Sequence, residues 1–374
     1  MMLPEFRLES YFGVWEFKAR YHLTASDAQT MELSELLEFA DSDDRLRWDA
    51  QRLGYIPSEG TPELRQAIAD TYDAAAQDDI LCFAGAEEGL YCAMHALLTP
   101  ADHAVVLVPN YQSMESVPRS ICAVSGVALH AQGGWNFDVD ELRAALQPNT
   151  RLVAVNFPNN PTGAIAPLRV FEQIVELCRE RGIYLFSDEV YRGIERDENK
   201  RLPQAADMYE RGLSLNVVSK AYGLPGLRVG WITCRDRDVL ARMVKIKHYL
   251  SICNAAPSEI LATIAVKAGG RIMRRNRDLC AENLRRLDAF FARHSDLFEW
   301  YTPDGGCVAF PRYLGPEGVE TFCAALVERA GVLLLPASMY HSDLLPVPKD
   351  RFRIGYGRVG MDEALSAFDG ALAH

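Results

Sequence analysis

Short apolar runs alternate with amphipathic segments through the middle of the chain. The apolar runs predict buried strands at 104–108, 127–130, 151–156, 183–187, 213–218 and 229–234. Apolar residues at helical spacing predict helices at 61–75, 87–98, 113–123 and 170–181 and one that begins at residue 138. Fully apolar strands separated by helices are typical of a mainly parallel sheet with both faces covered.

Beyond residue 235 the pattern changes to long Arg-rich helical stretches, then short strands near 307–310, 332–335 and 351–355 and a helix from Met361. This pattern predicts a second, smaller α+β unit. We expect residues 1–40 to form an N-terminal arm and part of the small domain, residues 41–268 the large domain, and residues 269–374 the small C-terminal domain. The predicted fold class is α/β, a mainly parallel sheet in a large domain plus a smaller α+β domain.

Composition then excludes several classes of protein. The chain has 374 residues, of which 49% are hydrophobic, so it can bury a large core. Its 39 basic and 51 acidic residues give a net charge of −12, which repels nucleic acids and anionic membranes. We find no basic and apolar export signal at the N-terminus and no apolar run long enough to cross a bilayer.

The number and spacing of the cysteines and histidines bear on the cellular compartment and on metal binding. The nine cysteines are an odd set without a CxxC pair, which indicates a reduced, cytoplasmic compartment without structural disulfides. The eight histidines are scattered, and none has HExxH spacing. The sequence therefore predicts no metal site.

Lys220 ends an apolar run and precedes a loop with three glycines. A lysine in this position can be partly desolvated, which lowers its pKa and makes the amine nucleophilic, as in a Schiff-base lysine. A strand-end lysine that reaches solvent is an equally good interpretation of this segment alone.

Two polar loops follow predicted strands. Residues 157–163 (FPNNPTG) follow one strand, and residues 187–191 (SDEVY) follow the next. Both loops leave the carboxyl ends of parallel strands, where open α/β sheets bind ligands. Taken alone, the first loop is an ordinary Asn/Pro turn, and Asp188 could equally be a helix cap.

Together these motifs form an ordered set: Asn160-Pro-Thr-Gly, Asp188 with Tyr191 three residues later, and Ser219-Lys220 with Arg228 eight residues past the lysine. The set resembles the signature of class I/II aminotransferases, which are fold-type I enzymes of pyridoxal 5′-phosphate (PLP). The resemblance runs from about residue 55 to residue 353.

The resemblance implies three catalytic residues, Lys220, Asp188 and Tyr191. Lys220 would hold PLP as a Schiff base and then carry the proton from the substrate Cα. Asp188 would pair with the protonated pyridine nitrogen and keep the ring electron-withdrawing. Tyr191 and Asn160 would donate to the phenolate oxygen of the ring, with a core tyrosine as the alternative for Tyr191.

The same resemblance places the cofactor phosphate where a helix begins. The expected ligands are the backbone at Gly85, Ala86 and Glu87, the Ser219 hydroxyl and the Arg228 guanidinium. Ala86 stands where relatives have a polar residue, and Val217 where many have Ser or Gly. Backbone amides would therefore supply more of the phosphate binding here.

Three further residues match the family. Tyr111 resembles the aromatic residue that stacks on the cofactor ring, with a core tyrosine as the alternative. Tyr55 resembles the tyrosine that reaches the neighbour's phosphate, which implies a homodimer with shared active sites. Arg353 matches the clamp for the substrate α-carboxylate, with a salt bridge as the alternative. Its neighbours Arg351 and Arg358 are interpreted as surface residues.

The N-terminal arm resembles the segment that closes over the substrate in this family. Its Glu16 and Asp27 are candidates to pair with a basic substrate side chain, and solvated surface charges are the alternative.

We expect transamination, the transfer of an amino group from an L-amino acid to a keto acid. The alternative is elimination or cyclisation of a hydroxylated guanidino amino acid, because residues 110–113 and 219–231 are similar to the capreomycidine synthase-like branch. A PLP-binding regulatory module is disfavoured, because the acidic chain starts directly with an aromatic arm and not with a helix-turn-helix module.

Overall fold

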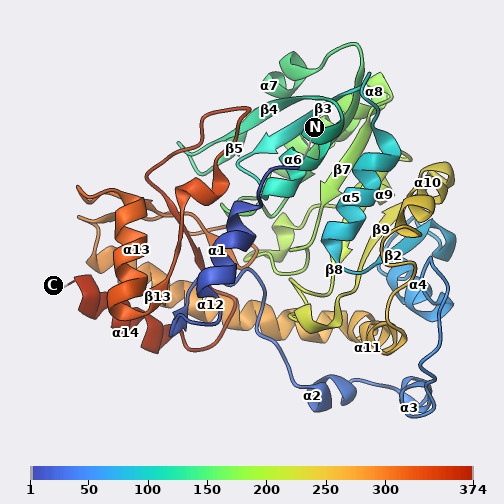
Figure 1. Ribbon diagram of the computed structural model, residues 1–374, viewed down its shortest axis with the longest axis horizontal. Coiled ribbons are helices and arrows are strands. Elements are labelled where there is room, and N and C mark those ends of the chain that lie inside the picture. Colours follow the sequence, from blue (N-terminus) through green and yellow to red (C-terminus); the bar gives the residue numbers. More distant parts are fainter. Residues whose placement is uncertain (1–2, 373–374) are drawn as a thin grey trace.

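The computed structural model describes residues 3–372 and is built around an eight-stranded sheet (Figure 1). The strand order is β2-β9-β8-β7-β6-β3-β4-β5. The bounds are β2 Ile80–Phe83, β3 His103–Val108, β4 Ala123–His130, β5 Asn136–Phe137, β6 Thr150–Asn156, β7 Tyr184–Asp188, β8 Gly212–Val217 and β9 Gly230–Cys234. Strands β4, β3, β6, β7 and β8 are parallel to one another, while β5 and β9 run antiparallel to their neighbours. The predicted α/β fold with a mainly parallel sheet is confirmed.

Helices cover both faces of this sheet. They are α4 Pro62–Ala69, α5 Ala86–Leu97, α6 Gln112–Ile121, α7 Val139–Ala145, α8 Leu168–Arg181, α9 Ala205–Met208, α10 Arg237–Lys247 and α11 Ala256–Lys267. The short helix α3 Ser42–Asp49 packs on α11 and not on the sheet (Figure 1). The predicted helix 61–75 is shorter in the structure and ends at Ala69, and β2 is a buried strand that we did not predict. A four-residue apolar run is too short to separate a strand from a helix by periodicity alone.

Successive residues of the strands enter two separate apolar cores. On β2 the side chain of Phe83 belongs to the core that contains Leu215 of β8 and residues of α5. Its neighbour Cys82 belongs to a second core, with Trp231 of β9 and residues of α4 and α11. Because side chains alternate across a strand, the two cores lie on opposite faces of the sheet.

The remaining elements form a smaller layer beside the sheet (Figure 1). Its helices are α12 Gly269–Arg293, α13 Val319–Ala330 and α14 Met361–Leu372, and its strands are β10 Phe298–Glu299, β11 Val308–Ala309, β12 Arg312–Tyr313, β13 Val332–Leu333, β14 Leu335–Pro336 and β15 Phe352–Gly355. The N-terminal part contributes α1 Arg7–Trp15, β1 Tyr21–His22 and α2 Leu33–Leu37. Strand β1 pairs in parallel with β13, so the N-terminal arm joins this layer. The division of the chain into residues 1–40, 41–268 and 269–374 stays a prediction.

Within residues 3–372 no helix is long and apolar enough to cross a membrane. The long helix α12 begins directly after α11 and extends from the large sheet to the smaller layer (Figure 1). Two fully buried asparagines on α12 make side-chain bonds to loops. Asn276 Nδ2 donates to the carbonyl of Ala221 at 2.8 Å. Asn283 Nδ2 donates to the carbonyls of Tyr356 at 3.0 Å and Arg358 at 2.7 Å.

We predict that Asn283→Ala destabilises the protein by roughly 1–3 kcal/mol, because it leaves two carbonyls after β15 without their donor. Urea unfolding measures this change in the free energy of unfolding. Arg285 on the same helix is exposed and offers a matched control, since substitutions at exposed positions usually change stability little. Equal stability of the two variants would contradict the assigned role of Asn283.

Candidate active site

A cavity of about 480 Å³ opens at the carboxyl ends of β6, β7 and β8, beside the N-terminus of α5 and the N-terminal arm. It brings together most of the residues predicted from the sequence: Glu16, Asp27, Ala86, Glu87, Tyr111, Asn160, Asp188, Tyr191, Ser219, Lys220, Arg228 and Arg353. Parallel strands end at the same edge, so segments far apart in the sequence meet there.

Lys220 follows β8 and turns its amine into this cavity. Its Nζ donates to the Ser26 hydroxyl at 2.8 Å. Burial lowers the pKa of the Lys220 amine, and the charge of Arg353 acts in the same direction, while Asp27 opposes both. The side chain is half-buried, and its amine lies in the cavity and not on the outer surface of the protein. The amine is placed and tuned to act as a nucleophile or a base.

Asp188 is the last residue of β7 and lies on the floor of the cavity. Burial raises the pKa of its carboxyl from 3.8 to about 7, although the Val190 amide donates to Oδ1 at 3.2 Å and Lys220 attracts the charge. None of the described residues forms an ion pair with Asp188. A half-buried carboxyl without an ion-pair partner favours a positively charged ligand group above it.

Tyr191, Asn160 and Arg353 form a connected cluster on one wall. The Tyr191 hydroxyl donates to the Ser26 carbonyl at 2.9 Å. Arg353 Nη1 donates to Asn160 Oδ1 at 3.2 Å, and its Nη2 donates to the Thr24 carbonyl at 2.6 Å. Arg353 is only 1% exposed and finds no carboxylate within 4.0 Å among residues 3–372. The salt-bridge alternative for Arg353 is therefore wrong, and its guanidinium can donate hydrogen bonds to the carboxylate of a ligand.

A cradle for an anion lies where α5 begins. Gly85 has φ +97°, and a Cβ there would lie 2.5 Å from Arg228 Nη2, so only glycine lets the arginine approach this turn. Arg228 itself has φ +51°. The Ser219 hydroxyl is buried and has no hydrogen-bond partner among the described residues. Free amides, a guanidinium and an orphaned hydroxyl together fit the phosphate of PLP.

Tyr111 lies at the start of α6 and lines the cavity. Its hydroxyl donates to Glu9 Oε1 at 2.8 Å, and its ring centroid lies 5.1 Å from that of Phe6. Helix α1 therefore holds the ring in place, which suits the predicted stacking role. Tyr55 is 91% exposed and does not line the cavity of its own chain.

The candidates for the substrate side chain have different surroundings. Glu16 lines the cavity, as predicted. Asp27 is buried and is held by Arg358, whose Nη2 lies 2.8 Å from both carboxylate oxygens. The alternative of a solvated Asp27 is wrong. The side chain of Arg358 is 40% exposed, in line with its surface interpretation, and it also lines the cavity. The surface interpretation is wrong for Arg351, which is 7% exposed and packs 4.9 Å from the Trp135 ring.

Sequence reasoning missed two features of the site. Ser26 contacts both Lys220 and Tyr191, but nothing in its local sequence marks it. The side chain of Glu87, expected to contribute only its amide, also faces the cavity. Burial raises the pKa of Glu87 to about 7, and the Ser113 hydroxyl donates to it at 2.9 Å. No group of three metal-ligating side chains occurs in the described part of the chain.

The sheet, the lysine after β8 and the carboxyl at the end of β7 define the class of fold-type I PLP enzymes. The model of the family "Aminotransferase class I and II" matches residues 24–368, and the chain belongs to that family.

Individual relatives agree with this assignment. Capreomycidine synthase of Streptomyces vinaceus is 30% identical over 373 residues, which cover 98% of this chain and 93% of that protein. A PLP-dependent aminotransferase from Streptococcus suis superposes with a TM-score of 0.91 at 27% identity, covering 100% of this chain and 98% of that one. The PLP-dependent cyclase OrfR gives a TM-score of 0.90 at 25% identity, with the same coverage.

The raised pKa of Asp188 predicts a pH dependence for the cofactor-free protein. Between pH 4 and 7 the folded state retains a proton that the unfolded state has released, so stability falls as the pH rises. The slope is up to about 1.4 kcal/mol per pH unit. Asp188→Asn removes this loss, so its free energy of unfolding should exceed that of the parent by a margin that grows to pH 7 and then stays constant.

Denaturant unfolding of the cofactor-free proteins at pH 5, 6, 7 and 8 measures this margin. Burial also raises the pKa of Glu87 and Glu189 to about 7, so the difference between the two proteins, rather than either slope, reports Asp188. The exposed Asp278 is the control, and Asp278→Asn should give no growing margin. A constant difference for Asp188→Asn across this range would contradict a buried carboxyl.

Proposed function

We propose that the cavity binds PLP, with Lys220 as its covalent anchor. The fit rests on three features of the chain: the anion cradle at Gly85 and Arg228, the Asp188 carboxyl, which has no ion-pair partner among the described residues, and the Lys220 amine, whose pKa burial lowers. When bound, the cofactor supplies an electron sink that stabilises a carbanion at the substrate Cα.

The chain's own residues would bind the cofactor and substrate and transfer the proton. Asp188 would hold a positive charge at the ring nitrogen, which its burial strengthens because no water screens the pair. Asn160 and Tyr191 would donate to the ring oxygen, for which Tyr191 exchanges its present bond to the Ser26 carbonyl. Arg353 would fix the substrate carboxylate, and Lys220 Nζ would take the proton from Cα at hydrogen-bond range.

We propose a homodimer in which Tyr55 completes the partner's phosphate site. Tyr55 is 91% exposed, and the nearby Leu53 is 86% exposed, so this loop carries apolar surface that a second subunit can cover.

All nine cysteines are free thiols, and seven are buried, which supports a location in a reducing compartment such as the cytoplasm.

Mixing two inactive variants tests the shared site. A chain with Lys220→Ala and a chain with Tyr55→Phe should form mixed dimers in which one of the two sites carries neither lesion. At equal amounts and random exchange, about one quarter of all sites should regain tight cofactor binding. Absorbance of the retained cofactor after gel filtration measures this recovery.

The control is Tyr301→Phe, which removes the hydroxyl of another exposed tyrosine and should bind the cofactor as the parent does. A monomer in sedimentation that retains the cofactor fully would contradict the shared site. A Tyr55→Phe protein with unchanged cofactor affinity would also contradict it.

We propose that the reaction is transamination of an L-amino acid. The observation that carries this proposal is the placement of an unpaired Arg353 guanidinium, the Lys220 amine and the Asp188 carboxyl around one cavity. This set serves loss of the Cα proton, the first step of amino-group transfer, and membership of the aminotransferase family supports it.

A second candidate is cyclisation of a hydroxylated guanidino amino acid. Two observations favour it. The whole-chain relatives include proteins named capreomycidine synthase and PLP-dependent cyclase. The carboxyl groups of Glu9, Glu16 and Glu87 also line the cavity, which suits a cationic substrate side chain. Asp27 is less available for this role because Arg358 already neutralises it.

Turnover without a keto acid separates the two reactions. The holoenzyme is mixed with one amino acid at a time, including arginine and a hydroxylated arginine. A transaminase converts its cofactor once to the amino form and stops, because no acceptor returns the cofactor to the aldehyde form. We expect this single conversion, followed by absorbance and by product analysis.

Lys220→Ala is the control and should show no conversion, because the proton carrier is missing. Sustained turnover of the hydroxylated arginine, independent of any keto acid, would contradict transamination and establish the second candidate.

A further inference from the structure

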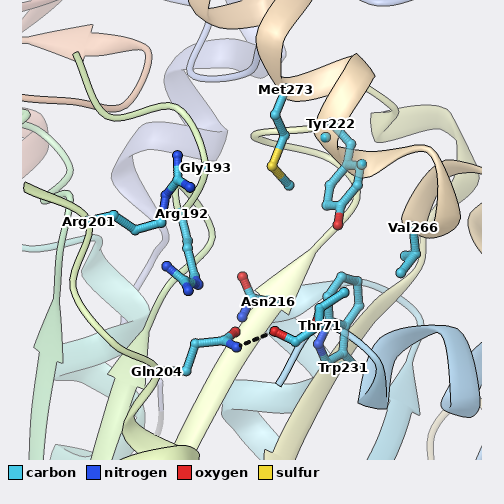
Figure 2. Close-up of a pocket in the computed structure, with 12 residues that line it drawn as sticks. Thr71, Arg192, Gly193, Arg201, Gln204, Asn216, Tyr222, Trp231, Val266 and Met273 are labelled. Atoms are coloured by element: carbon cyan, nitrogen blue, oxygen red, sulfur yellow. Dashed lines mark hydrogen bonds between the residues drawn. The ribbon is translucent and has the colours of Figure 1, made fainter. Parts of the chain in front are cut away.

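A second cavity, of about 200 Å³, is lined by residues of β8, β9, α11 and α12 and of the loops beside them (Figure 2). On β8, Leu215 and Val217 line the active-site cavity, whereas Asn216 between them lines the second cavity. Alternate residues of a strand point to opposite faces, so the sheet separates the two spaces. The two cavities share no lining residue.

One side of this second cavity is apolar and aromatic. Met273 of α12, Val266 of α11 and the rings of Tyr222 and Trp231 form it. Figure 2 shows Met273 and Tyr222 pointing into the same space from above and Trp231 closing it from below. This wall suits the flat or apolar body of a small organic molecule.

The other side is cationic. Arg192 directs its guanidinium toward Asn216 and Gln204 (Figure 2). Its Nη1 donates to the Leu202 carbonyl at 3.0 Å, and no carboxylate of residues 3–372 lies within ion-pair distance of it. The neighbouring Arg201 differs, because its Nε lies 2.8 Å from Glu195 Oε2.

Glu189 is a carboxyl that feels the charge of Arg192. Burial raises the pKa of Glu189 to about 7, so near neutral pH that carboxyl offsets the arginine only in part. Arg192 has a backbone carbonyl as its hydrogen-bond partner and no carboxylate at ion-pair distance among residues 3–372, and a guanidinium so placed beside a cavity favours an anionic ligand.

The buried indole of Trp231 contributes an apolar face to this cavity. The residue is 2% exposed, and its Nε1–H interacts with the Tyr72 hydroxyl, to which Asn216 Nδ2 also donates at 3.3 Å. The charge of Arg192 is therefore the polar feature on which recognition of a ligand rests.

We propose that this cavity is a binding site for a small organic carboxylate with an apolar body, distinct from the active site. The carboxylate would take two N–H bonds from Arg192, and the body would lie against Met273, Tyr222 and Trp231. The proposal does not depend on which reaction the active site catalyses.

The site would also touch segments that build the active site. Arg192 directly follows Tyr191, and Tyr222 is two residues beyond Lys220. An occupant that restrains Arg192 and Tyr222 would restrain the two backbone segments that position Tyr191 and Lys220. The cavity is thus placed to act as an effector site.

Calorimetric titration with 4-fluorobenzoate tests the proposal. The Arg353→Gln holoenzyme is used because Arg353 in the active site would also bind a carboxylate. We expect one saturable site per chain in this protein. Adding Arg192→Gln should weaken that site at least about tenfold, since it removes a charge-assisted pair of hydrogen bonds.

Matched controls separate this result from general charge effects. Arg169→Gln removes an exposed arginine on α8 and should leave the affinity unchanged. The neutral 4-fluorobenzamide should bind at least about tenfold more weakly than the acid. No saturable binding, equal binding of acid and amide, or unchanged affinity after Arg192→Gln would overturn the proposal.

A crystal of the unmodified holoenzyme soaked with 4-fluorobenzoate gives a readout that needs no variant. We expect the molecule between Arg192 and Met273, in addition to any copy at Arg353. Density only at Arg353 would overturn the second site and leave the proposed function intact. Density only between Arg192 and Met273 would support the second site and argue against the role of Arg353.

Discussion

The active site depends on three parallel strands that end at one edge. In the register of the sheet, Asp188 of β7 lies between Asn156 of β6 and Leu215 of β8. Strand pairing on both sides therefore holds the Asp188 carboxyl in a half-buried position, where it loses part of its hydration. Burial raises its pKa to about 7, and the position becomes favourable when a cationic group faces it. The sheet therefore holds at its edge a carboxyl that a cationic ligand group would stabilise.

The same sheet keeps two chemical environments apart. Leu215 and Val217 face the cavity that holds the lysine, while Asn216 faces a cavity with an unpaired arginine. Neighbouring residues of one strand point to opposite faces of the sheet, so the two cavities lie close together but remain separate. Any rearrangement of the loops after β7 and β8 changes both spaces at once, because Tyr191 and Arg192 are neighbours in the chain.

The N-terminal arm closes the active site by long-range pairing. Strand β1 pairs with β13, and this anchors the segment that carries Ser26 and Asp27. Ser26 then contacts Lys220 from 194 positions away in the sequence, and Asp27 holds Arg358 from 331 positions away. These contacts shape the substrate space, and Asp27 also opposes the burial effect that lowers the pKa of Lys220.

The sequence by itself determined the parallel sheet, because apolar runs of strand length separated by helices have few other ways to bury both faces. It also placed Lys220 and Asp188 at one edge, because each follows a predicted strand and the carboxyl ends of parallel strands meet, whereas Arg228 was assigned only through the family resemblance. Only the tertiary structure decided that Arg358 faces the active-site cavity and that Arg192 lies beside a second cavity. A short polar segment carries no periodic signal, and the surroundings of its side chains are set by partners that folding brings from elsewhere in the chain.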